Sequence, residues 1–299
     1  MAIPHQEQNI MERPLALYRR YFWEKKNIIF VHTASVDKLF ASRDAYLAAF
    51  GLGCDETSDQ RRDLETLILS ASLAAESQMT RDTWGWTVRL PFKSYGLFCG
   101  VETDGSLCCR TTALPKAARH DVVGAIAVQR VEANTPVRQT MLIPRDTQIH
   151  QIVEQYFEES EQLPARLALS TTEGLLALSM PQADWQEVAN LSEQALLEKF
   201  HALLAVGEVQ AAHPVHDAAD IAARVKAQYA QHKSGSALFQ GDLKCTHEAV
   251  FFYACRCSEE QMTQMITHLP EAQQKELWKG TQELSIECPR CGRTHILHK

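Results

Sequence analysis

Four cysteines near the end of the chain constrain its fold more than any other feature. They form two close pairs, Cys255-Arg-Cys257 and Cys288-Pro-Arg-Cys291. Two pairs of thiolates separated by a compact insert supply the ligands of a tetrahedral zinc site, in which each Zn–S bond measures about 2.3 Å. The spacing therefore predicts one Zn²⁺ ion, held in the reduced state by Cys255, Cys257, Cys288 and Cys291. The same four thiols could also leave the metal as two short disulfides.

The other candidate metal ligands are less well placed in the sequence. Three histidines close to the pairs could each replace a thiolate, although four thiolates need no help: His247, His268 and His295. The remaining cysteines form no comparable set, and we interpret them as buried small hydrophobes: Cys54, Cys99, Cys108, Cys109 and Cys245. On spacing alone, a static zinc knuckle that holds the tail together is favoured over a redox switch.

Composition excludes several classes of function. The 299 residues are 45% hydrophobic and 22% charged, as in an ordinary soluble globular protein. The formal net charge of −7 argues against a nucleic-acid-binding protein, which usually carries a basic face. No apolar run is long enough to span a membrane, and the N-terminus lacks the basic-then-apolar order of a secretory signal. We therefore expect a cytoplasmic protein, because thiols stay reduced in that compartment.

Residues 1–180 alternate between helical and strand periodicity. Apolar residues recur at helical spacing in Val36–Phe50, Asp59–Met79 and Ile149–Glu161, and Ser58 is a candidate N-cap for the second helix. Strand-like alternation or short apolar runs mark several other segments: Asn27–Val31, Trp84–Leu90, Tyr95–Val101, Leu107–Thr111, Val122–Val128, Gln139–Ile143 and Arg166–Ser170. Asp104-Gly105 predicts a hairpin turn. The expected fold class is α+β, with a mixed α/β main domain in which helices pack on β-sheets.

The rest of the chain divides into a linker and a small terminal unit. Residues 181–245 predict a helical linker of low intrinsic stability, because much of its apolar surface is alanine. Its larger apolar residues recur at helical spacing: Trp185, Val188, Leu191, Leu196, Leu197, Phe200, Leu203 and Leu204. Residues 246–299 are too few for a stable core and need a metal, disulfides or docking. Ser258 and Gln261 predict a capping box within that unit.

Catalytic motifs are missing from the sequence. It contains no glycine-rich phosphate loop, no Gly-x-Ser-x-Gly elbow and no paired-carboxylate motif, so we do not expect an enzyme. Cys288-x-x-Cys291 could suggest a thioredoxin-like site, but it lies at the end of the chain rather than after a first strand. An alternative is a zinc-ribbon module that binds RNA or another protein through a purely structural zinc. Acidic residues largely cancel the positive charge of the tail.

Two motifs in order along the chain resemble the Hsp33 family of redox-regulated holdase chaperones. The first is Tyr156–Pro164, which is similar to a helix-and-turn signature of that family. The second is Phe252–Ser258 followed by Cys288-Pro-Arg-Cys291-Gly292. Turns at Asp104-Gly105 and around Gly174-Leu175-Leu176 and Met180-Pro181 also match, so the resemblance covers most of the chain. The alanine- and histidine-rich linker is longer than is usual in the family.

The resemblance implies a function without nucleotide or catalytic residues. Oxidation of the four terminal cysteines to two disulfides would release zinc and unfold the terminal unit. The linker would then lose the terminal unit as its docking partner, and its apolar stripe would bind unfolded or partly folded client proteins. Residues 1–180 would supply client-binding and dimer surfaces, giving a homodimer when activated. Neither a membrane nor a nucleic acid is an expected partner.

Overall fold

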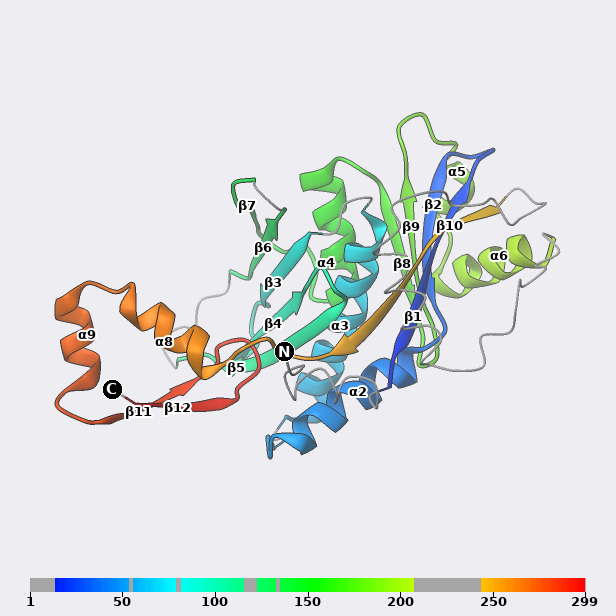
Figure 1. The fold of residues 1–299 in the computed structure, drawn as a ribbon. Coiled ribbons are helices and arrows are strands. Elements are labelled where there is room, and N and C mark those ends of the chain that lie inside the picture. Colours follow the sequence, from blue (N-terminus) through cyan, green and yellow to red (C-terminus); the bar gives the residue numbers. More distant parts are fainter. Residues whose placement is uncertain are drawn as a thin grey trace.

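The computed structural model describes residues 14–53, 56–78, 82–115, 123–132, 135–206 and 243–298. Ten strands form one sheet in the order β7-β6-β3-β4-β5-β10-β1-β2-β9-β8 (Figure 1). Their bounds are β1 Ala16–Trp23, β2 Ile28–Thr33, β3 Thr83–Arg89, β4 Tyr95–Val101, β5 Ser106–Ala113, β6 Ala125–Val131, β7 Arg138–Leu142, β8 Ala165–Leu169, β9 Gly174–Ser179 and β10 Leu243–Tyr253. The expected α+β fold class is confirmed.

The helices of the main body agree closely with the apolar periodicity. They are α2 (Val36–Ala49), α3 (Ser58–Ser77) and α4 (Ile149–Tyr156), the last continued by the π-helical turn η2 (Phe157–Glu161). The predicted cap of α3 is one residue off. Thr57, not Ser58, is the N-cap, because its side chain accepts from Gln60 N while the Gln60 side chain accepts from Thr57 N.

Strand β10 joins the two halves of the sheet. It pairs antiparallel with β1 along its length and parallel with β5 at Phe252 and Tyr253. The predicted boundary at residue 246 therefore falls inside a strand of the main sheet, and the small unit that carries the cysteines follows Tyr253. Strand pairing across such a distance leaves no local signal in the sequence. The division into three functional units stays a prediction.

Both faces of the β1-β2-β9-β8 half of the sheet are covered. Helix α3 contacts β1, β2 and β9 on one face, and α4 contacts β8. Helix α6 (Glu193–Val206) lies on the opposite face, next to the short α5 (Gln186–Ala189) (Figure 1). Two hydrophobic cores result, the first under α3 and α4 and the second under α6. Alternate residues of β9 face each of them: Leu176 and Leu178 lie in the first core, and Leu175 and Ala177 lie in the second.

Helix α6 is firmly packed on the second core. Leu196, Leu197 and Phe200 are all buried, and the Phe200 ring centroid lies 5.4 Å from those of both Tyr21 and Phe30. This corrects one expectation, because the apolar stripe of the linker docks on the main sheet and not on the terminal unit. The sheet offers a broad apolar face, which the terminal unit lacks. Residues 207–242 of the predicted linker lie outside the described residues.

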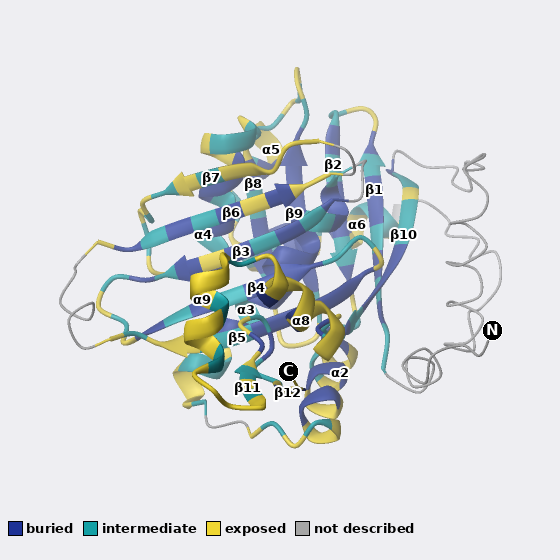
Figure 2. Ribbon diagram, turned by 60° about the vertical axis from the view of Figure 1, so that its left-hand side comes forward, coloured by how far each residue is buried: buried dark blue, intermediate teal, exposed yellow. Residues whose placement is uncertain are grey.

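The terminal unit contains two short helices and a two-stranded sheet. These are α8 (Glu259–Thr267), α9 (Glu271–Trp278), β11 (Glu283–Glu287) and β12 (Thr294–His298). Ser258 caps α8 by accepting a hydrogen bond from Gln261 N at 3.1 Å, as predicted. Helices α8 and α9 are largely exposed (Figure 2). Only Met262 and Ile266 of these two helices are buried, so little apolar surface holds the unit together.

Candidate metal centre

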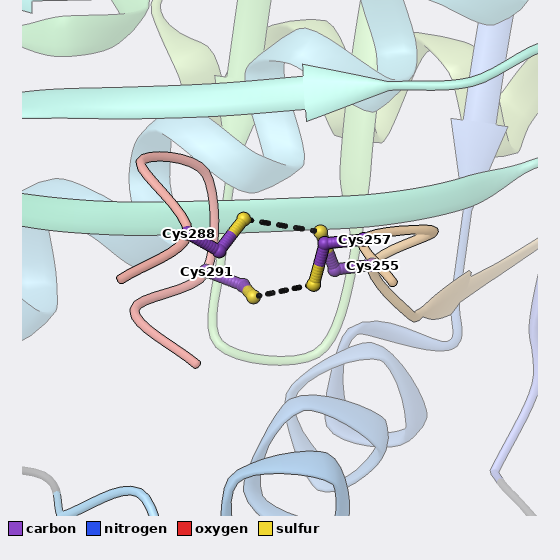
Figure 3. A group of neighbouring side chains, drawn as sticks. All are labelled: Cys255, Cys257, Cys288 and Cys291. Atoms are coloured by element: carbon purple, nitrogen blue, oxygen red, sulfur yellow. Dashed lines mark hydrogen bonds between the residues drawn. The ribbon is translucent and has the colours of Figure 1, made fainter. Parts of the chain in front are cut away.

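The four predicted cysteines meet in one cluster between β10 and the β11–β12 turn (Figure 3). Cys255 Sγ lies 3.9 Å from Cys288 Sγ, and Cys257 Sγ lies 3.6 Å from Cys291 Sγ. A tetrahedron with Zn–S bonds of about 2.3 Å has S···S edges of about 3.8 Å, and the two separations bracket this value. All four thiols are free rather than joined in disulfides. Their geometry and chemistry fit a zinc ion.

Local backbone structure places each pair of sulfurs. Cys255 and Cys257 follow directly from the end of β10, where Ala254 N donates to Leu107 O at 2.8 Å and ties the chain to β5. In the second pair, Gly292 N donates to Cys288 O at 2.9 Å, and Cys288 N donates to Arg293 O at 2.8 Å. Gly292 has a φ of 81°, which favours glycine. The resulting tight turn points both sulfurs inward.

The packed thiols cannot all ionise without a cation among them. Hydrogen bonds from the other thiols, led by Cys255, lower the pKa of Cys288. Hydrogen bonding with Cys255 likewise heads the causes that raise the pKa values of Cys257 and Cys291. For Cys255 itself, a hydrogen bond with Cys108 comes first and raises the pKa to about 12. A divalent cation would remove this mutual penalty by stabilising all four thiolates.

Side chains other than the four cysteines also contact the cluster directly. His295 is buried, and its Nε2 lies 3.2 Å from Cys257 Sγ. The Tyr46 hydroxyl donates to Cys291 Sγ at 3.7 Å, and burial, followed by the charge of Cys291, raises the pKa of this tyrosine. Both residues can therefore donate to a metal-bound thiolate and orient it. His295 acts beside the ligands rather than as one of them.

Arginines attach the terminal unit to the main body. Arg256 pairs with Asp104 at 2.6 Å, and Arg290 pairs with the largely buried Glu102. In the other direction, Arg110 of β5 pairs with Glu287 and donates to Cys288 O at 3.2 Å. These contacts lie around the metal centre, so its geometry and the docking of the unit depend on each other.

One further arginine of the tail packs on an aromatic ring. The guanidinium of Arg293 lies 4.1 Å from the Phe50 ring centroid. From the sequence alone, the positive charges of Arg256, Arg290 and Arg293 could have served to bind nucleic acid. All three contact the main body instead.

The remaining candidate residues lie elsewhere. His247 contacts Glu76 and His268 contacts Gln264 O, so neither histidine reaches the sulfurs. Cys99, Cys108 and Cys109 are buried and Cys245 is half-buried, whereas Cys54 lies outside the described residues. Among these, Cys108 is buried as predicted, and its thiol also adjoins Cys255. The strand pattern indicates that Cys108 and Cys109 lie on opposite faces of the sheet, but it cannot show that Cys255 lies next to Cys108.

Comparison with known proteins gives two matches. The family profile described as Hsp33 protein matches residues 86–297, a span that includes the metal centre. Among solved structures, the chain is similar to the 33 kDa chaperonin (heat shock protein 33 homolog) of Thermotoga maritima. The TM-score is 0.56 at 14% identity, with 96% of this chain and 95% of that chain covered. At this identity the structural match shows a shared fold alone. No curated protein matches, and no helix among the described residues is long and apolar enough to cross a membrane.

Proposed function

The chain belongs to the Hsp33 family of chaperones, and from this premise we propose that it is an ATP-independent holdase activated by oxidation of Cys255, Cys257, Cys288 and Cys291. The observation that carries the proposal is the separation of the sulfurs, 3.6 and 3.9 Å, which suits four thiolates around one zinc ion. Its clients are unfolded or partly folded proteins. We place it in the cytoplasm, as a homodimer when activated.

In the reduced state the four thiolates hold the terminal unit in its fold. Zinc supplies binding free energy that is largely folding free energy, on the order of 10–16 kcal/mol in zinc-finger peptides. The unit needs this contribution because α8 buries only two of its residues and α9 none. His295 and Tyr46 orient the sulfurs, and the surrounding arginines keep the unit against β5 and α2.

Oxidation removes the ligands in pairs. Each disulfide forms as two thiolates lose two electrons to an oxidant such as hydrogen peroxide or hypochlorite. Cys255 is the half-buried member of the four, so the oxidant reaches it first, while the other three are buried. A disulfide holds two sulfurs about 2.05 Å apart, far closer than the separations in the cluster. The cluster cannot keep its geometry through this step, and the terminal unit unfolds.

Strand β10 transmits the change to the sheet. It runs directly into Cys255, and on the other face of the sheet its Leu243 belongs to the core under α6. Loss of the terminal unit frees the end of β10 at Phe252 and Tyr253. These two residues make up the short pairing of β10 with β5. Loosening of β10 then weakens the docking of α6. The aromatic side chains that α6 covers, Tyr21 and Phe30, become available to clients.

Zinc content and holdase activity measured on the same samples test the proposal. The reduced protein should hold one zinc at the four cysteines and suppress aggregation of a thermally unfolded client poorly. Peroxide with mild heat should release that zinc to a chromogenic chelator and raise suppression in parallel. Cys245→Ser, which changes a cysteine away from the cluster, should behave like wild type. If a variant lacking all four terminal cysteines were inactive, or if oxidant activated it, the proposed switch would be wrong.

The alternative of a zinc-ribbon module that binds RNA receives less support. Arg256, Arg290 and Arg293 already contact acidic or aromatic residues of the main body. A nucleic-acid binder would show a steep fall of affinity with salt in a filter-binding titration. We expect no such dependence.

A further inference from the structure

A second group of metal-ligating side chains lies beneath α6, on the face of the sheet opposite α3. His32 extends from β2, Glu173 from the β8–β9 turn and His201 from α6. Glu173 Oε2 lies 3.1 Å from His32 Nε2 and 2.9 Å from His201 Nε2. The three ligand atoms all lie within 4.8 Å of one another. Segments distant in the sequence thus place two imidazoles and one carboxylate around a single point.

The spacing and chemistry fit a first-row transition metal. Tetrahedral sites with metal–ligand lengths of about 2.0–2.1 Å have edges of about 3.3 Å, close to the two N···O separations. Two histidines with one carboxylate bind Zn²⁺ and leave a position for water, whereas Mg²⁺ and Ca²⁺ prefer sites made of oxygen atoms. The side chain of His201 is 48% exposed, which gives an ion access, while those of His32 and Glu173 are 13% and 19% exposed.

The surroundings of the cluster hold its members in place. The His32 ring packs on Phe200, with centroids 4.8 Å apart, and Phe200 is fully buried. The backbone of Glu173 is fixed by Ser170, whose Oγ accepts from Glu173 N at 3.0 Å and whose N donates to Glu173 O at 2.9 Å. Such support of the residues around a site is what a metal site of defined geometry requires.

We propose that His32, Glu173 and His201 form a second zinc site, which clamps helix α6 to the sheet. An ion here joins α6 to β2 and to the β8–β9 turn, and so stabilises the docked helix in proportion to zinc occupancy. The binding itself is independent of the terminal cysteines. Its consequence, that zinc opposes exposure of the apolar face under α6, rests on the proposed function.

Equilibrium dialysis of the full-length reduced protein against buffered zinc tests the site. We expect the wild type to bind a second equivalent, more weakly than the first. His201→Gln and Glu173→Gln should each weaken that equivalent at least tenfold, since loss of even an outer-sphere partner costs 10–100-fold in affinity. The first equivalent should be unchanged, as read from the thiolate charge-transfer bands of the cobalt-substituted protein. His268→Gln, at the exposed histidine that follows α8 as its C-cap, is the matched control.

Two residue-specific measurements complete the test. Zinc should shift the imidazole nitrogen signals of His32 and His201 in NMR spectra, and it should slow hydrogen exchange of α6 amides in the wild type but not in the variants. Saturation at one equivalent would overturn the second site and show that Glu173 only accepts hydrogen bonds. A second equivalent that survives in both variants would overturn it too. If the wild type bound no zinc at the four cysteines, that result would instead count against the cysteine switch alone.

Discussion

Phe200→Ala should turn on client binding in the reduced protein without any oxidant. Phe200 is fully buried and its ring lies within 5.4 Å of the rings of Tyr21, Phe30 and His32. Replacing such a phenylalanine by alanine costs about 3–5 kcal/mol, because transfer free energy is lost and a cavity remains. At about 1.36 kcal/mol per factor of ten, the ratio of undocked to docked α6 rises by roughly 10²- to 10³-fold or more.

Aggregation suppression by the reduced, zinc-loaded variant is the assay. The variant should suppress aggregation of an unfolded client as well as the oxidised wild type does, while cobalt spectra show the cysteine site intact. Leu67→Ala is the matched control. Leu67 is also fully buried, but it lies on α3 in the core of the opposite face, and its truncation costs about 2–5 kcal/mol. It should destabilise the protein without activating it.

Hydrogen exchange decides between the possible outcomes. If α6 amides exchange faster in Phe200→Ala and the reduced variant is still inactive, then uncovering this face does not create the client-binding surface. The reasoning would also fail if Leu67→Ala activated the protein equally, since general destabilisation would then explain the effect.

Three further predictions concern the metal centre and the docking of α6. His295→Ala should weaken zinc binding at the cysteines by about 10- to 100-fold in chelator competition, because it removes a contact to Cys257 Sγ; unchanged affinity would refute an outer-sphere role. Arg290→Met should leave the buried Glu102 without its charged partner and weaken docking of the terminal unit by about 1–3 kcal/mol, seen as faster hydrogen exchange in α8 and β12, whereas Lys275→Met on exposed α9 should have no effect. Hydrogen bonds from Lys199 and then Lys26 lower the pKa of Glu187 from its ordinary value of 4.5 to about 2. The ionised carboxylate therefore stabilises the fold at pH values above 4.5, and this stabilisation is lost as the pH falls towards 2. Exposure keeps the contribution small, and Glu187→Gln should remove this step from the pH dependence of α6 exchange.

The sequence predicted best those features that depend on local pattern. Helix α2 and strand β3 have one buried face, so the apolar period is visible. Strand β9 was not predicted as a strand, because both of its faces are buried and its residues do not alternate. The start of β10 was not predicted, since its first residues include Lys244, Thr246 and Glu248, whose polarity hides a strand that lies between two others.

At the metal centre, too, the residues that follow a local sequence pattern were predicted and the contacts that depend on the fold were not. The four cysteines were predicted because zinc ligands follow a short spacing rule that is written in the sequence. The contacts made by Tyr46, Cys108 and Arg110 depend on how α2 and β5 lie against the terminal unit, and no local pattern carries that information. His295 was recognised as a candidate, but only the fold shows that it lies beside Cys257.

The central position of β10 has a consequence for synthesis of the protein. Its pairing with β1 joins residues such as Arg19 and Glu248, which are 229 positions apart. A growing chain on the ribosome must therefore carry β1 with an unpaired edge until nearly all of the protein has emerged, and β5 likewise lacks its partner β10 until that point. Exposed edges of this kind favour aggregation, and contacts between distant residues slow folding. A nascent copy of this chain is thus itself the kind of incomplete structure that chaperones bind.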